Sequence, residues 1–165
     1  MDGRLTLRPM TSQEYPEFAR RSLEGYVEQK VELGGVPAEQ ARAEGEKDFA
    51  ELLPDGPRTV GQWIRVGEVD GVAVGVLWIG LRDEPGPRFA WVYDVEVDEP
   101  YRGRGHGRAL MLAAEDLARE IGAQRLGLNV FGGNTRARRL YESLGYSTTA
   151  LQMAKDLGES GATAG

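Results

Sequence analysis

Apolar residues in the first third of the chain recur three and four positions apart, which is the spacing of one helix face. Thr11 or Ser12 can cap this helix, and Glu14 is placed to close a capping box on Thr11. A short strand at 3–9 is expected before it, and a second, weaker helix at 37–53 after it. The apolar stripe consists of Tyr15, Phe18, Ala19, Leu23, Tyr26 and Val27.

The periodicity then changes to the alternation that is typical of strands. Strands are predicted at 63–69 and 72–80, joined by the hairpin signal Asp70-Gly71. A further strand is predicted at 89–97, after a second turn. Strict alternation within it is expected to place Phe89, Trp91, Tyr93, Val95 and Val97 on one face. These patterns predict three consecutive antiparallel strands.

The second half of the chain alternates between the two periodicities. It predicts a helix at 110–121, a strand at 126–130, a helix at 137–144 and a final strand at 146–157. The predicted order is β-α-α-β-β-β-α-β-α-β. This order indicates an α/β fold: one domain over residues 1–157, with helices flanking a mixed, mostly antiparallel central sheet. The small polar residues of 158–165 predict a disordered tail.

Composition limits the classes of function. Hydrophobic residues make up 41% and charged residues 28% of the 165 residues, as in ordinary globular proteins. No apolar run is long enough to cross a bilayer, and a signal peptide pattern is absent, so we expect a cytoplasmic protein without a membrane partner. The net charge of −6 argues against electrostatic binding to nucleic acid. With no cysteine and one histidine, neither a thiolate nucleophile nor a metal site is expected.

The basic residues gather in one glycine-rich loop. The segment 102–107 reads Arg-Gly-Arg-Gly-His-Gly, follows a predicted strand and opens a predicted helix. Glycines allow the main chain to approach a ligand, and a helix start offers unpaired N–H groups to an anion. The nucleotide P-loop requires Gly-Lys-Ser or Gly-Lys-Thr, which is missing, and the dinucleotide fingerprint requires a glycine where Arg108 or Leu110 stands. A different phosphate-binding loop is therefore expected.

Two segments resemble the signatures of the GCN5-related N-acetyltransferase (GNAT) family. Arg102, Gly105 and Gly107 match its first signature, an Arg or Gln followed at fixed spacing by Gly and by Gly or Ala. The second is similar to the run from 128 to 153, which includes Asn134 and Tyr141. Together the two signatures cover residues 88 to 154. The resemblance implies acetyl transfer from acetyl-CoA to a primary amine.

The resemblance also implies a set of site residues. The pyrophosphate is expected on the main chain of the glycine-rich loop, and the pantetheine arm along the strand that ends at Val97, between this strand and the one at 126–130. Tyr141 matches the general acid for the departing thiolate. The main-chain N–H of Val95 or Val97 is the candidate oxyanion donor. The implied cofactor-binding residues are Val95, Val97, Arg102, Gly103, Arg104, Gly105, His106, Gly107, Arg108, Asn134 and Tyr141.

The general base is the least defined part of the site. Asp94 and Glu96 lie on the cofactor strand, on the face opposite Val95 if alternation holds, and Glu96 is included as a catalytic candidate. Glu24 and Glu28, one turn apart, could line an acceptor groove, although exposure to solvent is the favoured interpretation of this pair. Structural roles also remain open, since Asn134 can serve as a helix N-cap and Tyr141 as a packed aromatic.

The sequence leaves several functional alternatives. The acceptor could be a small molecule, a peptide N-terminus or a lysine. A non-catalytic acyl-CoA-binding module and an acyltransferase with a longer acyl group are the alternative functions. A homodimer is a hypothesis taken from the family alone.

Overall fold

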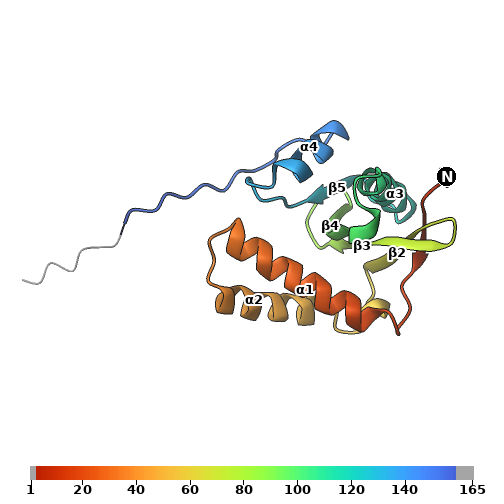
Figure 1. Cartoon of the computed structure of the whole chain (residues 1–165), viewed down its shortest axis with the longest axis horizontal. Coiled ribbons are helices and arrows are strands. Elements are labelled where there is room, and N and C mark those ends of the chain that lie inside the picture. The colour runs from red at the N-terminus through yellow and green to blue at the C-terminus, as the bar shows by residue number, and fades with distance from the viewer. Residues whose placement is uncertain (1–2, 159–165) are drawn as a thin grey trace, which may run out of the picture.

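The computed structural model describes residues 3–158, in which a five-stranded sheet lies between helices (Figure 1). Helices α1 and α2 cover one face of the sheet, and α3 covers the other. The elements are β1 (Thr6–Pro9), α1 (Tyr15–Glu32), α2 (Ala38–Leu52), β2 (Gln62–Val69), β3 (Val72–Arg82), β4 (Phe89–Val97), α3 (His106–Glu120), β5 (Arg125–Leu128) and α4 (Thr135–Ser143), with short 3-10 helices at Gly56–Arg58 and Glu99–Tyr101.

The entry into α1 is fixed by the predicted capping box. The Thr11 N–H donates to Glu14 Oε2 at 2.9 Å, and the Glu14 N–H donates to Thr11 Oγ1 at 3.2 Å. Arg8 on β1 donates to Glu14 at 2.7 Å and to Glu68 on β2 at 2.6 Å. The Arg8 hydrogen bond, followed by the one from the Thr11 amide, lowers the pKa of Glu14 to about 2. This network fastens the start of α1 to the edge of the sheet.

The sheet is mixed and mostly antiparallel, as predicted. Its strand order is β1-β2-β3-β4-β5; the first four strands pair antiparallel, and β5 pairs parallel to β4. The β2–β3 hairpin turns through Asp70 (φ 51°) and Gly71 (φ 78°). Positive φ at both central residues is the requirement of a type I′ turn, so the local signal was read correctly.

Apolar side chains form a core on each face of the sheet. On the α3 face, Leu77 and Ile79 of β3 pack with Leu110 and Met111, all fully buried. On the other face, Trp78 packs with Phe18, Ile64, Met10 and Leu53. Each large apolar side chain buried in this way stabilises the fold by about 1.5–3 kcal/mol. Because both faces are packed, β4 is held in place from either side.

The prediction of strict alternation along β4 is wrong. Trp78 pairs with Asp94 and Ile79 with Val92, so Tyr93 is an extra residue opposite a continuous β3. Val92 therefore lies in the α3-side core, while Tyr93 packs on the other face and stacks on Trp78 with a centroid distance of 4.7 Å. The bulge brings Tyr93 and Asp94 to the face of α1 and α2.

The predicted final strand at 146–157 is also not formed. Residues 146–158 have no regular structure, and those from 147 onward are exposed. The chain that follows residue 152 extends away from the body (Figure 1). A strand needs a neighbour for its main-chain groups, and within residues 3–158 no strand pairs with the segment. Of the predicted tail at 158–165, all but Gly158 lies outside the described residues.

Candidate active site

Strand β4 has β5 as a neighbour along only part of its length. The parallel pairing joins Phe89–Val92 to Arg125–Leu128 and then stops, whereas β4 continues beside β3 to Val97. Within residues 3–158 no other strand covers this stretch of β4. On this side of β4, the main chain at 93–97 therefore has no strand partner within residues 3–158. This is the stretch where the resemblance places the pantetheine arm beside Val95 and Val97.

The glycine-rich loop connects the end of β4 to α3. Gly103 (φ 76°) and Gly105 (φ 82°) adopt left-handed conformations, and α3 begins at His106 without a side-chain cap. The first N–H groups of a helix have no intrahelical acceptors and carry the positive end of its dipole. Arg102 and Arg104 are exposed beside them. The loop thus offers N–H groups and cationic side chains to an anion.

Direct contacts join this loop to β4 and α4. Arg102 Nε donates to the Val97 carbonyl at 2.9 Å, and Arg108 donates to Ser143 Oγ on α4 at 3.0 Å. A methyl group added at Gly107 would lie 3.7 Å from Leu140 and 3.8 Å from Val97, so both elements pack close to the first turn of α3. Because residue 107 is a glycine, no side chain fills the space between the first turn of α3, α4 and β4.

Tyr141 projects from α4 into partly buried surroundings. Its ring meets that of Tyr146 edge-on, with a centroid distance of 6.1 Å. Burial raises the pKa of Tyr141 above its ordinary value, and the negative charge of Asp94 adds to the effect. The hydroxyl therefore stays protonated at neutral pH, as a proton donor must.

Asn134 has a clear structural role. Its side-chain oxygen accepts a hydrogen bond from the Ala137 N–H at 3.3 Å and caps the N-terminus of α4. The contact explains this residue type without a ligand. A cofactor contact at Asn134 stays a prediction.

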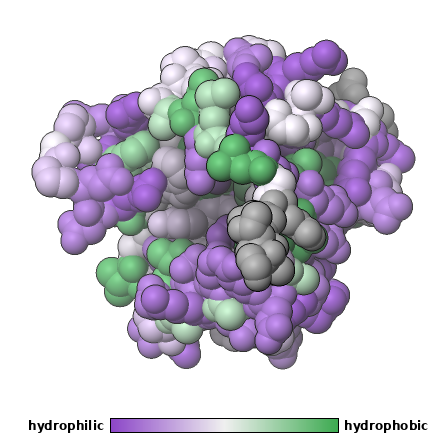
Figure 2. Space-filling view, turned by 90° about the vertical axis from the view of Figure 1, so that its left-hand side faces the viewer, coloured by the Kyte–Doolittle hydropathy of each residue, from purple (hydrophilic) through white to green (hydrophobic). Residues whose placement is uncertain are grey.

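A cleft of about 650 Å³ lies between β4 and the helices α1 and α2. Figure 2 views the molecule from the side toward which residues 147–158 extend, and shows a hollowed surface among hydrophilic residues with hydrophobic residues scattered along its rim. Asp94, Val95 and Glu96 contribute to the cleft from β4, together with Arg102. Its remaining lining includes Arg21, Glu24, Glu28 and Tyr26 of α1, and Asp48 and Phe49 of α2.

The two β4 carboxylates differ in their partners. Glu96 accepts from Arg21 at 2.7 Å and lies 3.8 Å from Arg102, whereas no cationic side chain of the described chain is within 4.0 Å of Asp94. Burial raises the pKa of Asp94 to about 6; the Ser22 hydroxyl opposes this shift, the charge of Glu96 adds to it, and that of Arg21 opposes it. Asp94 can therefore exchange a proton near neutral pH.

The acidic pair on α1 divides between two environments. Glu24 pairs with Arg42 of α2 at 3.0 Å, whereas Glu28 is exposed at the cleft. Lys30 pairs with Glu44 at 2.6 Å, which further ties α1 to α2. These pairs hold the helical wall of the cleft together.

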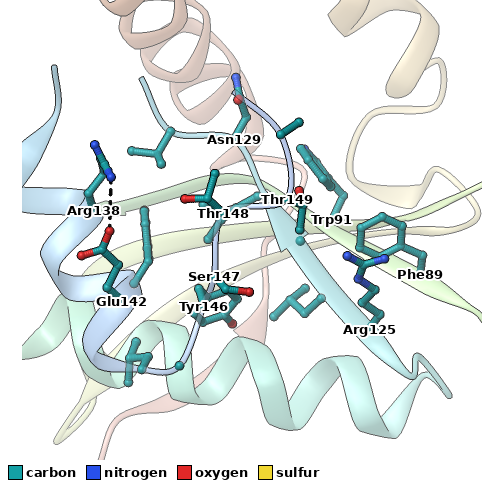
Figure 3. A pocket seen from close by; sticks show the side chains of 18 of the residues that line it. Phe89, Trp91, Arg125, Asn129, Arg138, Glu142, Tyr146, Ser147, Thr148 and Thr149 are labelled. Atoms are coloured by element: carbon teal, nitrogen blue, oxygen red, sulfur yellow. Dashed lines mark hydrogen bonds and ion pairs between the residues drawn. The ribbon is translucent and has the colours of Figure 1, made fainter. Parts of the chain in front are cut away.

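A second cavity, of about 660 Å³, lies on the far side of β5 (Figure 3). It is bordered by β5, α3 and α4, and by residues 146–152, which cross in front of β5. The hydroxyl of Tyr146 is buried at this cavity without a hydrogen-bond partner. Burial raises the pKa of Tyr146 to about 12.

The described part of the chain has neither a cluster of metal ligands nor a membrane-spanning helix. Between residues 3 and 158, no three His, Asp or Glu side chains are grouped so as to hold a metal ion. No helix in the same range is both long and apolar enough to span a bilayer.

A sheet in which β5 pairs with only part of β4, a glycine-rich loop at a helix start and an adjoining cleft are the features that the resemblance to the acetyltransferases implies. The sequence profile of the acetyltransferase (GNAT) family matches residues 24–146. The chain belongs to this family and is an N-acetyltransferase, so the resemblance found in the sequence is confirmed.

Individual relatives support this assignment over nearly the full chain. YycN of Bacillus subtilis, described as an uncharacterized N-acetyltransferase, is 35% identical over 93% of this chain and 99% of its own. Its crystal structure superposes with a TM-score of 0.87, covering 93% of this chain and 98% of that one at 33% identity. The mycothiol acetyltransferase of Propionibacterium freudenreichii is 33% identical over 74% of this chain but only 36% of its own.

A more distant structure shares the fold alone. The aminoglycoside N-acetyltransferase AAC(6')-Iy, solved in complex with CoA, has a TM-score of 0.60 at 18% identity. It covers 94% of this chain and 96% of its own.

Sequence reasoning left two features of the site undescribed. Arg21 was not singled out, although it joins α1 to Glu96 of β4 and to Asp98, which directly follows β4. Asp94 was placed on the correct face but not separated from Glu96. The available signal was an arginine in the middle of an otherwise acidic helix face, and its meaning depends on a contact between residues 75 positions apart in the chain.

Proposed function

We propose that this enzyme transfers the acetyl group of acetyl-CoA directly to a primary amine that enters the cleft between β4 and the helices α1 and α2. One observation carries the proposal: β4 loses its β5 neighbour after Val92, and the stretch that follows borders the cleft and ends at Val97, where the glycine-rich loop contacts it. A donor and an acceptor can thereby approach the same main-chain groups from opposite sides.

The donor site follows from the main chain. The pyrophosphate would rest on N–H groups between Arg102 and Arg108, with the arginines opposing its charge. The pantetheine arm would lie beside Val95 and Val97, where the main-chain groups of β4 have no strand partner on this side within residues 3–158. The residues present fit this group, because the loop glycines leave the approach free of side chains.

Acetyl-CoA supplies an activated acetyl group, and the protein supplies the proton transfers and the positioning. The N–H of Val95 or Val97 would donate to the acetyl oxygen as negative charge develops on it. A C–N bond forms while the C–S bond breaks. Tyr141 would donate its proton to the departing sulfur, which its raised pKa permits at neutral pH.

Asp94 is the general base that we propose. A free alkylamine has a pKa near about 10 and is mostly protonated at neutral pH, so a group in the cleft must remove a proton. Asp94 has no cationic partner and a pKa of about 6, whereas Glu96 is engaged by Arg21. The assignment therefore moves from Glu96 to Asp94, with Glu96 holding Arg21 in place.

The acceptor remains one of three kinds: a small molecule, a peptide N-terminus or a lysine. The exposed Glu28 and the aromatic lining of the cleft favour a cationic amine with an apolar portion. A longer acyl donor is the alternative. A cytoplasmic location, independence from metals, nucleic acid and membranes, and assembly as a homodimer complete the proposal.

The first test is thermal unfolding with acetyl-CoA and, separately, with NAD or ATP. A ligand at 100 times its Kd stabilises the folded state by about 2.7 kcal/mol. For a chain of this size the expected shift is roughly 5 to 10 °C. Stabilisation by acetyl-CoA alone supports the donor site, whereas no shift, or a larger one with NAD or ATP, would refute it.

Turnover is then measured by thiol release with a panel of primary amines. Acetyl-CoA is compared with propionyl- and butyryl-CoA at equal concentration. Faster release from a longer donor would replace the acetyl assignment by the alternative one. Binding of acetyl-CoA without thiol release from any amine of the panel would contradict the acceptor proposal.

A further inference from the structure

The side chain of Arg102 covers a main-chain carbonyl at the end of β4. The carbonyl of Val97 and the N–H of Asp98 belong to one trans peptide, in which the two groups point in opposite directions. The Asp98 N–H donates to the Val74 carbonyl of β3 at 2.9 Å, so the Val97 carbonyl points away from β3. On that side it accepts a hydrogen bond from Arg102 Nε at 2.9 Å.

The pantetheine arm needs the same carbonyl. The arm carries two amide N–H groups, and alternation along the strand leaves the carbonyls of Val95 and Val97 as acceptors on the side that β5 does not cover. An amide N–H that leaves water without finding an acceptor weakens binding. An arm that pairs along β4 as far as Val97 therefore has to take the place of the Arg102 guanidinium.

The present contacts hold Arg102 only weakly. Its side chain is 52% exposed, and its one acidic neighbour, Glu96, lies 3.8 Å away and already accepts from Arg21 at 2.7 Å. An exposed ion pair of this length contributes little. The guanidinium can therefore leave Val97 when a stronger acceptor comes within its reach. Such an acceptor is the pyrophosphate, because the loop proposed to bind it begins at Arg102 itself.

We propose that Arg102 makes the enzyme selective for acyl donors that carry the pyrophosphate, an inference that rests on the proposed function. The arm displaces the guanidinium from the Val97 carbonyl, and the guanidinium moves to a phosphate oxygen. A neutral hydrogen-bond acceptor is thereby exchanged for a charged one, which binds an arginine more strongly. A pantetheine thioester without phosphates has to displace Arg102 and offers no acceptor in return.

The test compares the Kd of CoA with that of pantetheine by calorimetric titration of the full chain. In Arg102→Ala the Kd of CoA should rise about 10-fold, because a charge-assisted hydrogen bond is lost. The Kd of pantetheine should fall about 3-fold, because the Val97 carbonyl is then uncovered. A pantetheine Kd that is unchanged or raised in Arg102→Ala would overturn the proposal.

Arg104→Ala is the matched control. Arg104 is exposed in the same loop but does not line the cleft, whereas Arg102 does. This variant should weaken CoA binding and give no gain for pantetheine. An equal gain in both variants would also overturn the proposal, since the positive charge of the loop, and not the contact with Val97, would then oppose pantetheine. Circular dichroism establishes that each variant is folded.

A crystal structure of the unaltered protein with CoA tests the displacement directly. Arg102 Nε should lie beyond hydrogen-bond distance of the Val97 carbonyl, with the guanidinium on a pyrophosphate oxygen. An arginine that stays on Val97 beside the bound arm would refute the inference. The acetyl-CoA thermal shift separates the two levels: without it the proposed function fails, whereas a normal shift with no gain for pantetheine removes only the role of Arg102.

Discussion

Arg21 of α1 donates to Glu96 of β4 at 2.7 Å, and its second terminal nitrogen donates to Asp98 at 3.2 Å. One guanidinium thus ties the helical wall of the acceptor cleft to the strand proposed to hold the donor. The same contact neutralises Glu96 next to Asp94. Arg21 therefore connects two walls of the cleft, and its positive charge lowers the pKa of Asp94, the proposed base.

Replacing Arg21 by Gln should raise the pKa of Asp94 further. The positive charge of Arg21 lowers this pKa and the negative charge of Glu96 raises it, so removal of the arginine leaves the unfavourable charge alone. The acid limb of the kcat/KM profile should move to higher pH. An unchanged acid limb would show that a group other than Asp94 sets the pH dependence of kcat/KM on the acid side.

Asp94→Asn should lower kcat by about 100-fold or more, because general-base catalysis contributes factors of 10²–10⁴. The unaltered enzyme should gain activity as pH rises through about 6, where Asp94 loses its proton, and the variant should lack this limb. Glu96→Gln is the comparison, and it should retain the limb. If Glu96→Gln removes the limb and Asp94→Asn does not, the roles are reversed.

The same Asp94→Asn variant should unfold at a higher temperature than the unaltered protein above pH 6. A carboxyl whose pKa is raised in the folded state is ionised there at a cost in stability. The gain should be on the order of 1–3 kcal/mol, and should vanish below about pH 4, where both states of the unaltered protein bind the proton. Calorimetry at pH 8 and pH 4 measures the difference. If the variant and the unaltered protein differ in stability by the same amount at pH 8 and at pH 4, the raised pKa is contradicted.

Tyr141→Phe should lower kcat by about 100-fold and leave the acetyl-CoA thermal shift intact, because it removes a proton donor and little else. Tyr146→Phe is the matched control: it removes the neighbouring buried hydroxyl, which has no role in the proposed chemistry. Its kcat should be unchanged. Equal losses in both variants would indicate a packing role for Tyr141.

Gly105→Ala should weaken acetyl-CoA binding by about 10-fold, or about 1.4 kcal/mol, because the loop would have to change its main chain. Gly61 offers a close control: its φ is 80° against 82° at Gly105, and neither glycine has a neighbour within 4 Å of an added methyl group. Each alanine variant should lose about 1–2 kcal/mol of stability from the left-handed conformation. Only the one at 105 should change the Kd, as measured by calorimetric titration.

Glu14→Gln should destabilise the fold by about 0.5–1 kcal/mol, a value that allows for solvent screening of this partly exposed carboxylate. Its pKa is lowered from 4.5 to about 2, so its contribution is complete above 4.5 and is lost as pH falls through 2. Urea unfolding at pH 7 and pH 2 should show the difference shrinking in acid. A constant difference would place the effect in the capping box and not in the charge.

Local signals in the sequence were read accurately. The capping box of Thr11 and Glu14 and the Asp70-Gly71 turn depend on residues within a few positions of each other, and both formed as predicted. The phosphate loop belongs to the same kind, because a glycine-rich turn and a helix start are local features. Gly103 and Gly105 adopt left-handed conformations in this turn, and phosphate binding by the loop stays a prediction.

Features that depend on distant contacts were missed. The bulge at Tyr93 appears in the pairing of β4 with β3, and alternation within β4 alone gave the wrong face for Val92. The final strand had the right pattern, but within residues 3–158 the segment pairs with no other strand. The partners of Glu96 could not be predicted from the sequence either, because Arg21 lies on α1 and Glu96 on β4.

The end of β5 at Leu128 leaves the middle of β4 with one main-chain edge uncovered. Amides on such an edge exchange their hydrogens with solvent more readily than those in a complete ladder. A donor that hydrogen-bonds along residues 93–97 would slow this exchange and make the sheet continuous. Without a donor, the main chain of the sheet would then be most flexible at the proposed reacting stretch of β4. The rigidity of the sheet would increase when the donor binds and decrease when the product leaves, once in every turnover.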